Sequence, residues 1–191
     1  MLTNVATQPR IPIVRELPAD LETPISVYLK LAGNGPSFLL ESVTGGEYVA
    51  RYSFLGVDLC DAFILKDDQW DIFGDVDNPS IPVKEAQTPL QALRDYLGMV
   101  PNLDARSQTP GLPRFSGGLV GYLGFESVRY FEPTLPLVPH PDLPEAILLL
   151  ADTLIAFDHA YGKLLLIANA HGESGIPDAQ ARLDDLVARL D

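Results

Sequence analysis

A carboxylate, a hydroxyl and a guanidinium stand close together beside apolar sequence in FLLESVTGGEYVARYSFLG, residues 38–56. Phe38 to Leu40 predicts a buried strand that ends at Glu41 and Ser42, and the chain returns as a second strand that carries Arg51. The plainest chemistry is structural: Glu41 and Arg51 would form a cross-strand ion pair worth about 0.2–1 kcal/mol, and Ser42 would initiate a turn. The register of the strands decides whether Arg51 points inward.

No other group of residues matches the spacing of a catalytic or metal site. The histidines lack the spacing of zinc ligands: His140, His159 and His171. The acidic stretch DIFGDVDNPS has Phe73 at the third position of a calcium loop, where a ligand is needed. The glycines between Gly117 and Gly124 miss the dinucleotide-binding pattern, and neither a P-loop nor a G-x-S-x-G elbow occurs. The sequence therefore predicts no catalytic residue, metal ligand or cofactor in this chain.

The charge balance argues against a nucleic-acid-binding protein. Lys and Arg number 13 and Asp and Glu 26, a net charge of −13, whereas phosphate neutralisation needs a basic surface. The single cysteine, Cys60, cannot form an internal disulfide. The amino terminus lacks the pattern of a signal peptide, and the apolar stretch AILLLADTLIAF is interrupted by Asp152 and is too short to cross a bilayer. We therefore expect a cytoplasmic protein that binds neither nucleic acid nor membrane.

Capping residues and periodicity predict four helices. TPISVYLKLAG has Thr23 as its N-cap and a proline in the first turn, and TPLQALRDYLG repeats the pattern from Thr88, with Gln91 three residues after the cap. A final amphipathic helix carries apolar residues at helical spacing: Leu183, Leu186, Val187 and Leu190. A short helix is expected in ESVRYFE, where Arg129 and Glu132 lie three residues apart and would form a surface pair.

Strands are expected in adjacent hairpins. They are predicted near residues 37–43 and 47–56, on both sides of a turn at Asp67-Asp68, in GGLVGYLGF, and near residues 145–157 and 162–169. Residues 1–10 are expected to be a lead-in tail. Because the strands come in hairpins and not in regular βαβ alternation, the pattern predicts an α+β fold: a mostly antiparallel, sandwich-like sheet with flanking helices, in a single domain over residues 1–191.

Two separate segments carry the signatures of a known family. Leu39–Ser42 gives L-L-E-S and Arg51–Phe54 gives R-Y-S-F, while a second signature joins Gly117-Gly118 and Gly121-Tyr122 to Val128–Glu132. These strings resemble the amino-terminal region of anthranilate synthase component I, the chorismate-using lyase that opens tryptophan biosynthesis. The resemblance covers roughly residues 10–170.

The resemblance implies an effector site at the strand end, because the L-L-E-S element of this family lines the site where L-tryptophan binds as feedback inhibitor. A free amino acid presents an ammonium, a carboxylate and a side chain, so it needs an acceptor, donors and an apolar slot. We expect Glu41, through its carboxylate or its backbone and with Ser42 as hydroxyl partner, to take the ammonium side and Arg51 to hold the carboxylate. Leu40 and Tyr52 would contribute apolar wall. Part of the family's pocket comes from the other half of the polypeptide.

The resemblance also implies partners. Family members are much longer, and their chorismate-binding, Mg²⁺-dependent catalytic half lies carboxy-terminal to this region. No part of that half is recognised in these 191 residues, so we expect the chain alone to be inactive and Mg²⁺ to bind only in the other half. In the intact enzyme a glutamine amidotransferase subunit supplies the ammonia.

Two alternatives stay open. The first is the corresponding region of aminodeoxychorismate synthase component I, an enzyme of folate precursor supply that shares the same layout; some of its relatives hold tryptophan as a structural ligand. The second is a free-standing amino-acid-binding module. Inhibition of the intact enzyme by tryptophan would separate the first alternative from anthranilate synthase, and a chorismate-binding half encoded directly downstream would exclude the second.

Overall fold

The computed structural model of the chain describes residues 10–41, 51–59, 61–74, 80–81, 87–98 and 111–190. Its two antiparallel β-sheets and their helices confirm the predicted α+β class. The described residues gather into two compact units. Unit 1 takes those within Cys60–Pro101 and Leu119–Leu150, and unit 2 takes those within Gln8–Leu59, Asn102–Gly118 and Ala151–Asp191. The single domain and the sandwich-like packing of the sheets stay predictions.

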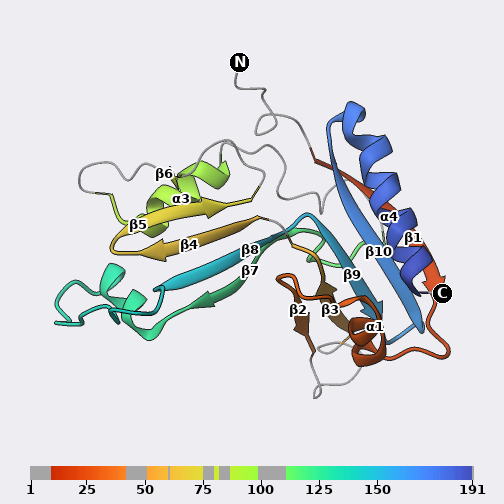
Figure 1. Ribbon diagram of the computed structural model, residues 1–191, viewed down its shortest axis with the longest axis horizontal. Coiled ribbons are helices and arrows are strands. Elements are labelled where there is room, and N and C mark those ends of the chain that lie inside the picture. Colours follow the sequence, from red (N-terminus) through yellow and green to blue (C-terminus); the bar gives the residue numbers. More distant parts are fainter. Residues whose placement is uncertain are drawn as a thin grey trace. The chain divides into compact units, whose positions relative to one another are not determined.

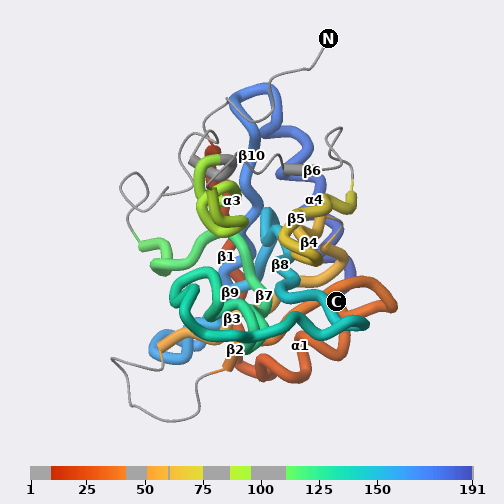
Figure 2. Tube along the Cα trace, turned by 90° about the vertical axis from the view of Figure 1, so that its left-hand side faces the viewer, coloured from red at the N-terminus to blue at the C-terminus, as the bar shows by residue number. Residues whose placement is uncertain are grey.

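Unit 2 is built on a sheet of five strands in the order β1-β10-β9-β3-β2 (Figure 1). The strands are β1 (Arg10–Pro18), β2 (Phe38–Leu40), β3 (Tyr52–Gly56), β9 (Thr153–Asp158) and β10 (Lys163–His171). All neighbouring pairs are antiparallel, and β1 pairs with β10 along its whole length. The red and blue ends of the colour scale therefore meet in one sheet, as the turned view also lets the reader follow (Figure 2).

Two helices cover one face of this sheet and form the core of unit 2. They are α1 (Pro24–Leu31) and α4 (Ile176–Leu190), the second preceded by the 3-10 helix η4 (Glu173–Gly175). Their apolar stripes bury the alternate residues of the strands: Val27, Leu31, Leu183 and Leu186 pack with Leu55, Ile155, Phe157, Leu164 and Leu166. The predicted cap of α1 is confirmed, since the Thr23 hydroxyl accepts a 3.0 Å hydrogen bond from the Ser26 N–H.

Unit 1 is built on the second sheet, in the order β6-β5-β4-β8-β7. The elements are β4 (Ala62–Lys66), β5 (Gln69–Phe73), β6 (Ser80–Ile81), α3 (Pro89–Gly98), β7 (Gly118–Leu123), the 3-10 helix η3 (Phe125–Tyr130) and β8 (Ala146–Ala151). The core joins Trp70, Phe63 and Leu65 to Leu93 of α3, and the Trp70 indole donates a 2.8 Å hydrogen bond to the Pro89 carbonyl. The predicted β4–β5 turn is confirmed, with Asp67 and Asp68 at positive φ.

The strand predictions differ from the structure in two places. β1, Arg10–Pro18, was not predicted, and residues 1–9 of the expected lead-in lie outside the described residues. The single strand expected near residues 145–157 is wrong, because the structure divides it into β8 and β9. The division falls at Asp152, whose carboxylate and backbone are engaged with β1, β10 and α4, so the continuous apolar run serves two different sheets.

Glycine in β7 allows a close approach of backbone. A Cβ atom built on Gly121 would collide with the carbonyl oxygen of Ile147 and would lie 2.9 Å from the Cα of Leu148. The contacting atoms are backbone of β8 and cannot swing aside. The glycine-rich strand GGLVGYLGF therefore needs Gly121 for this approach, which is one of the two roles expected for a glycine inside a strand.

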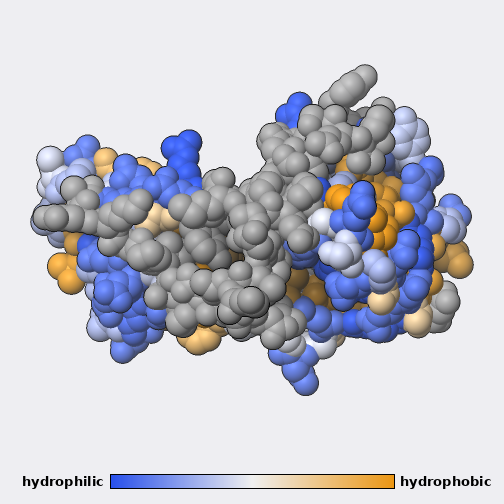
Figure 3. All heavy atoms as spheres, turned by 90° about the horizontal axis from the view of Figure 1, so that it is seen from above, coloured by the Kyte–Doolittle hydropathy of each residue, from blue (hydrophilic) through white to orange (hydrophobic). Residues whose placement is uncertain are grey.

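The surface is mainly hydrophilic among the described atoms of the face in Figure 3, with small hydrophobic areas between them. Within the part of the chain that the structure describes, no helix has the length and hydrophobicity needed to cross a membrane.

Candidate functional site

Most of the expected site residues lie together where β2 ends and β3 begins. Leu40 pairs directly with Phe54 and its side chain is 48% exposed. Glu41 follows β2, is exposed, and makes no hydrogen bond or ion pair with another described residue. Ser42 lies outside the described residues, and its role stays a prediction.

An aromatic row, Tyr52, Phe54 and Phe115, adjoins Leu40. Tyr52 and Phe54 are two residues apart on β3, so their side chains lie on the same face of the sheet. Leu40 of β2 is directly opposite Phe54 and lies on that face too. Their ring centroids are 5.9 Å apart, and the Phe54 and Phe115 rings meet edge to face at 5.4 Å and 89°. Phe54 and Phe115 were not predicted as site residues, although the alternation of side chains along a strand places Phe54 on the same face as Tyr52.

Arg51 is held by a carboxylate from β9, which neighbours β3 in the sheet but lies more than a hundred residues away in the sequence. Its Nε and Nη2 donate hydrogen bonds of 3.1 and 2.7 Å to the two oxygens of Asp158. Its guanidinium lies over the rings of Tyr52 and Tyr161, at 4.8 and 4.9 Å. The alternative of a Glu41–Arg51 ion pair is therefore wrong, while a role of Arg51 toward a ligand carboxylate stays a prediction.

The protonation of the site is set by this pair. Burial alone would raise the pKa of Asp158, but the hydrogen bonds and charge of Arg51 lower it below its ordinary value. The same hydrogen bonds raise the pKa of Arg51, and burial raises the pKa of Tyr52. In the folded chain at neutral pH, the Asp158 carboxylate is therefore ionised and forms a salt bridge with Arg51.

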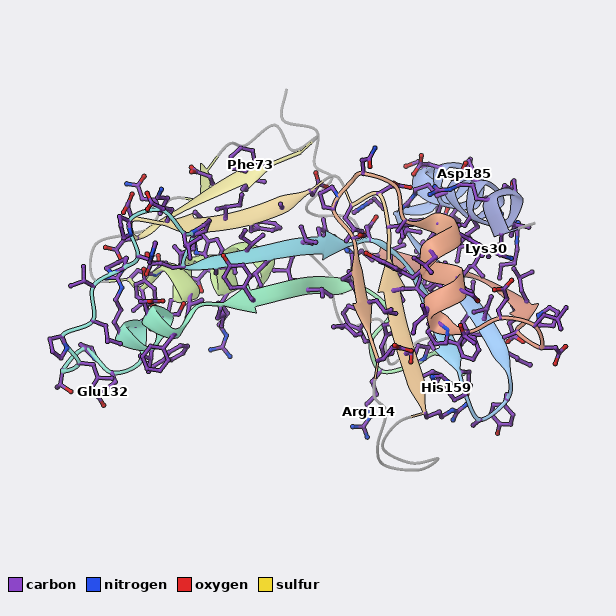
Figure 4. All side chains as sticks on the ribbon, turned by 60° about the horizontal axis from the view of Figure 1, so that its bottom comes forward. Lys30, Phe73, Arg114, Glu132, His159 and Asp185 are labelled. Carbon is purple, nitrogen blue, oxygen red and sulfur yellow. The ribbon has the colours of Figure 1, made fainter. Side chains whose placement is uncertain are left out.

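The opposite face of β3 carries a second polar contact. Ser53, 1% exposed, lies 2.8 Å from Nε2 of His159, and the His159 ring packs against Phe157 at 4.8 Å. His159 follows the end of β9 (Figure 4). The sequence analysis considered His159 only as a zinc ligand, since its partner Ser53 lies more than a hundred residues away.

A second arginine network lies in unit 1. Arg129 donates to Glu145 Oε2 through Nε and Nη2, at 3.1 and 2.8 Å, and through Nη2 to Asp68 at 2.7 Å. The Tyr130 hydroxyl bonds both carboxylates, and its burial raises its pKa. The expected Arg129–Glu132 pair is therefore wrong. Glu132 accepts instead from Thr134 and lies at the outer end of the loop that follows η3 (Figure 4).

A third polar cluster surrounds Asp152 in unit 2. Arg10 bonds one carboxylate oxygen at 2.7 Å, and His171 and Arg182 approach the other at 3.2 and 3.3 Å. Burial would raise the pKa of Asp152, whereas the hydrogen bond from His171 and the charges of Arg10 and Arg182 lower it. The cluster ties β1, β10 and α4 together at the point where β9 begins.

None of these clusters has the donor set of a metal centre. Within the described ranges, no group of three or more His, Cys, Asp or Glu side chains is arranged to hold a metal ion. At the β2–β3 end, Leu40, Tyr52 and Phe54 instead form an apolar and aromatic face with the Arg51 guanidinium at its edge, and the exposed Glu41 follows Leu40 in the chain. Such a set is suited to a small ligand with both a charged and an apolar part.

Comparison with known proteins finds a similarity to one part of a longer protein. No protein-family model matches the chain. Anthranilate synthase component 1 of Pseudomonas aeruginosa is 39% identical over 189 residues, which are 95% of this chain and 37% of that protein. The protein of the same name from Acinetobacter calcoaceticus is 39% identical over 181 residues, and that from Mycobacterium tuberculosis H37Rv is 40% identical over 188.

The chain belongs with the amino-terminal region of anthranilate synthase component I. It spans little more than a third of the length of these relatives, 35–37% of each. Among solved structures, anthranilate synthase component I from Streptococcus pneumoniae TIGR4 is 20% identical, with a TM-score of 0.49, and the match covers 89% of this chain and 36% of that one.

Proposed function

We propose that the chain is the regulatory and scaffold region of an anthranilate synthase component I and carries part of an L-tryptophan feedback site. The observation that supports the site most directly is Glu41, an exposed carboxylate without a partner among the described residues, next to Leu40 and the aromatic row. An ammonium needs such an acceptor, and an indole needs such an apolar face.

Arg51 fits the proposal at the edge of this site. Its Nε and Nη2 are used by Asp158, so Nη1 is the nitrogen left to receive a ligand carboxylate. The two tyrosine rings and Asp158 hold the guanidinium in place, which lowers the entropy cost of binding. In this proposal Leu40 and Tyr52 line the apolar side, and Ser42 is the hydroxyl partner of the ammonium.

Calorimetric titration with L-tryptophan tests the site. Wild-type chain should bind L-tryptophan more tightly than L-phenylalanine. Glu41→Gln should weaken the Kd by about tenfold or more, because it removes a charge-assisted hydrogen bond. Glu173→Gln, which changes an exposed carboxylate elsewhere on unit 2, is the matched control and should bind as the wild type does.

The proposal fails if folded wild-type chain shows no saturable binding of L-tryptophan, or if Glu41→Gln binds as tightly as Glu173→Gln. Ser42→Ala extends the test to the strand end. A weaker Kd in that variant supports the hydroxyl contact, and an unchanged one removes Ser42 from the site.

Catalysis and partners are part of the same proposal. The chorismate-binding domain and its Mg²⁺ would lie in the remaining part of a full-length component I, a glutamine amidotransferase subunit would supply ammonia, and this chain alone would have no lyase activity and need no cofactor. Joined to that remainder, it should support anthranilate formation that L-tryptophan inhibits. Formation of aminodeoxychorismate without such inhibition would favour the folate enzyme instead, and binding without either activity would favour a free-standing amino-acid-binding module.

A further inference from the structure

The F-S-G-G segment, Phe115–Gly118, ends in the Gly117-Gly118 pair of the second sequence signature, which the proposed site does not yet explain. The structure places its aromatic residue against the site: Phe115 meets Phe54 edge to face at 5.4 Å, and Phe54 pairs with Leu40. Phe115 is half-buried and is not part of any helix or strand. Its position therefore depends on what holds the residues that follow it.

Asn169 of β10 holds this segment. Its side chain is 2% exposed and its Nδ2 donates hydrogen bonds to two carbonyls, Ser116 at 2.9 Å and Asp152 at 3.0 Å. The amide therefore joins the F-S-G-G segment to the residue that separates β8 from β9. Because both N–H groups are used, replacing the side-chain donor would remove the hydrogen bond to the buried Ser116 carbonyl, whereas the Asp152 carbonyl would keep its 2.9 Å hydrogen bond from the Asn169 backbone N–H.

The two glycines permit this arrangement. A Cβ on Gly117, at φ +156°, would lie 2.6 Å from Nδ2 of Asn169, so any side chain there would displace the amide. A Cβ on Gly118, at φ +137°, would lie 3.5 Å from Cε2 of Phe115. The glycine pair thus gives the backbone a conformation that other residues rarely adopt. It also lets the backbone pass close to the Asn169 amide at Gly117 and close to the Phe115 ring at Gly118.

We propose that Asn169 is a positioning residue that fixes Phe115 against Phe54, and that Phe115 determines which aromatic side chain the site accepts. The inference rests on the proposed amino-acid site and extends it from the β2–β3 end to a distant sequence signature. A bicyclic indole offers more face to an edge-on ring than a phenyl group does, so Phe115 should favour L-tryptophan over L-phenylalanine.

The first experiment measures ring position without ligand. In the NMR spectrum of ¹³C-phenylalanine-labelled chain, the ring current of Phe115 should change the chemical shifts of the Phe54 ring protons. Phe115→Leu should remove this change in chemical shift, and Asn169→Asp should reduce it although Phe115 is still present. Gly117→Ala offers a second route to the same effect, since it pushes on the same amide. An unchanged Phe54 spectrum in both Asn169→Asp and Gly117→Ala would overturn the positioning role.

The second experiment measures selectivity by calorimetry. Phe115→Leu should weaken L-tryptophan binding about tenfold, the order of an aromatic contact, and should bring the ratio of the L-phenylalanine and L-tryptophan Kd values toward one. Phe73→Leu, a 56% exposed phenylalanine in unit 1, is the matched control and should change neither value. Wild-type binding with unchanged selectivity in Phe115→Leu overturns this inference alone, whereas no binding by the wild type overturns the proposed function and the inference with it.

Discussion

Each unit contains an arginine that pairs with a buried carboxylate and lies over a tyrosine ring, and the two pairs differ in how completely the carboxylate is satisfied. Asp158 in unit 2 accepts from Arg51 through both oxygens and from the Ala160 N–H. Glu145 in unit 1 is 2% exposed and accepts side-chain hydrogen bonds from Arg129 and Tyr130 at Oε2, while its buried Oε1 has no partner among the described residues.

The difference shows what each pair contributes. A buried carboxylate with an unpaired oxygen carries a desolvation cost, so Glu145 depends on its single arginine for its charge to be tolerated. Arg51 is 37% exposed on its side chain, against 20% for Arg129, and adjoins the candidate site. We infer that the unit 1 pair mainly stabilises the fold, whereas the unit 2 pair also presents a cation at a surface.

The largest effect is expected from Arg129→Ala. It leaves Glu145 buried without a cation and removes a donor from Asp68, so the free energy of unfolding should fall by about 3–5 kcal/mol. Urea denaturation measures this. In Arg51→Ala, the Asp158 carboxylate keeps its hydrogen bond from the Ala160 N–H, so the loss of stability should be smaller. The comparison is contradicted if Arg51→Ala destabilises the chain more than Arg129→Ala does.

The acid side of the stability curve sharpens the comparison. The folded pKa of Asp158 is lower than in the unfolded chain, so this group stabilises the fold above the unfolded value of about 3.9, and the contribution is lost as the pH falls through the folded value. Asp158→Asn should therefore be less stable than the wild type at pH 7, with a difference that narrows in acid. Asp71→Asn, an exposed carboxylate on β5, should show no such pH-dependent difference in urea denaturation.

The smallest effect is expected from Glu132→Ala. The Glu132 carboxylate forms no ion pair with Arg129 and bonds only Thr134 among the described residues, so thermal unfolding should match the wild type. A loss of stability comparable to that of Arg129→Ala would restore the surface pair that the sequence spacing favoured and would contradict the network with Glu145.

Local chemistry made much of the fold predictable. Thr23 and Thr88 mark the starts of α1 and α3 because a hydroxyl before a first turn satisfies a free N–H, and both caps are formed. The aspartates of the β4–β5 turn tolerate positive φ, which places the hairpin correctly. The α+β class followed from these local signals.

Partners far apart in sequence were not predictable in the same way. Arg51 and Arg129 pair with carboxylates on other elements of the fold. Helical spacing and the pairing of neighbouring strands could suggest only partners that are close in the sequence, which were Glu132 for Arg129 and Glu41 for Arg51. β1 contains Pro12 and Pro18, which disfavour a strand prediction, and it is a strand because it pairs with β10. One signal was available and unused: Asp152 in an apolar run marks the place where the run changes sheets.

The pairing of β1 with β10 also orders the folding of the chain. Arg10 lies opposite His171, so this edge of the sheet cannot form on the ribosome until β10 has been synthesised. Unit 1, encoded between them, can collapse first around Trp70 and Leu93. Closing so long a loop is slow. Until β10 takes its place between β1 and β9, β9 is left with an open edge. Unit 2 is therefore the part of these 191 residues whose folding waits for the synthesis of β10.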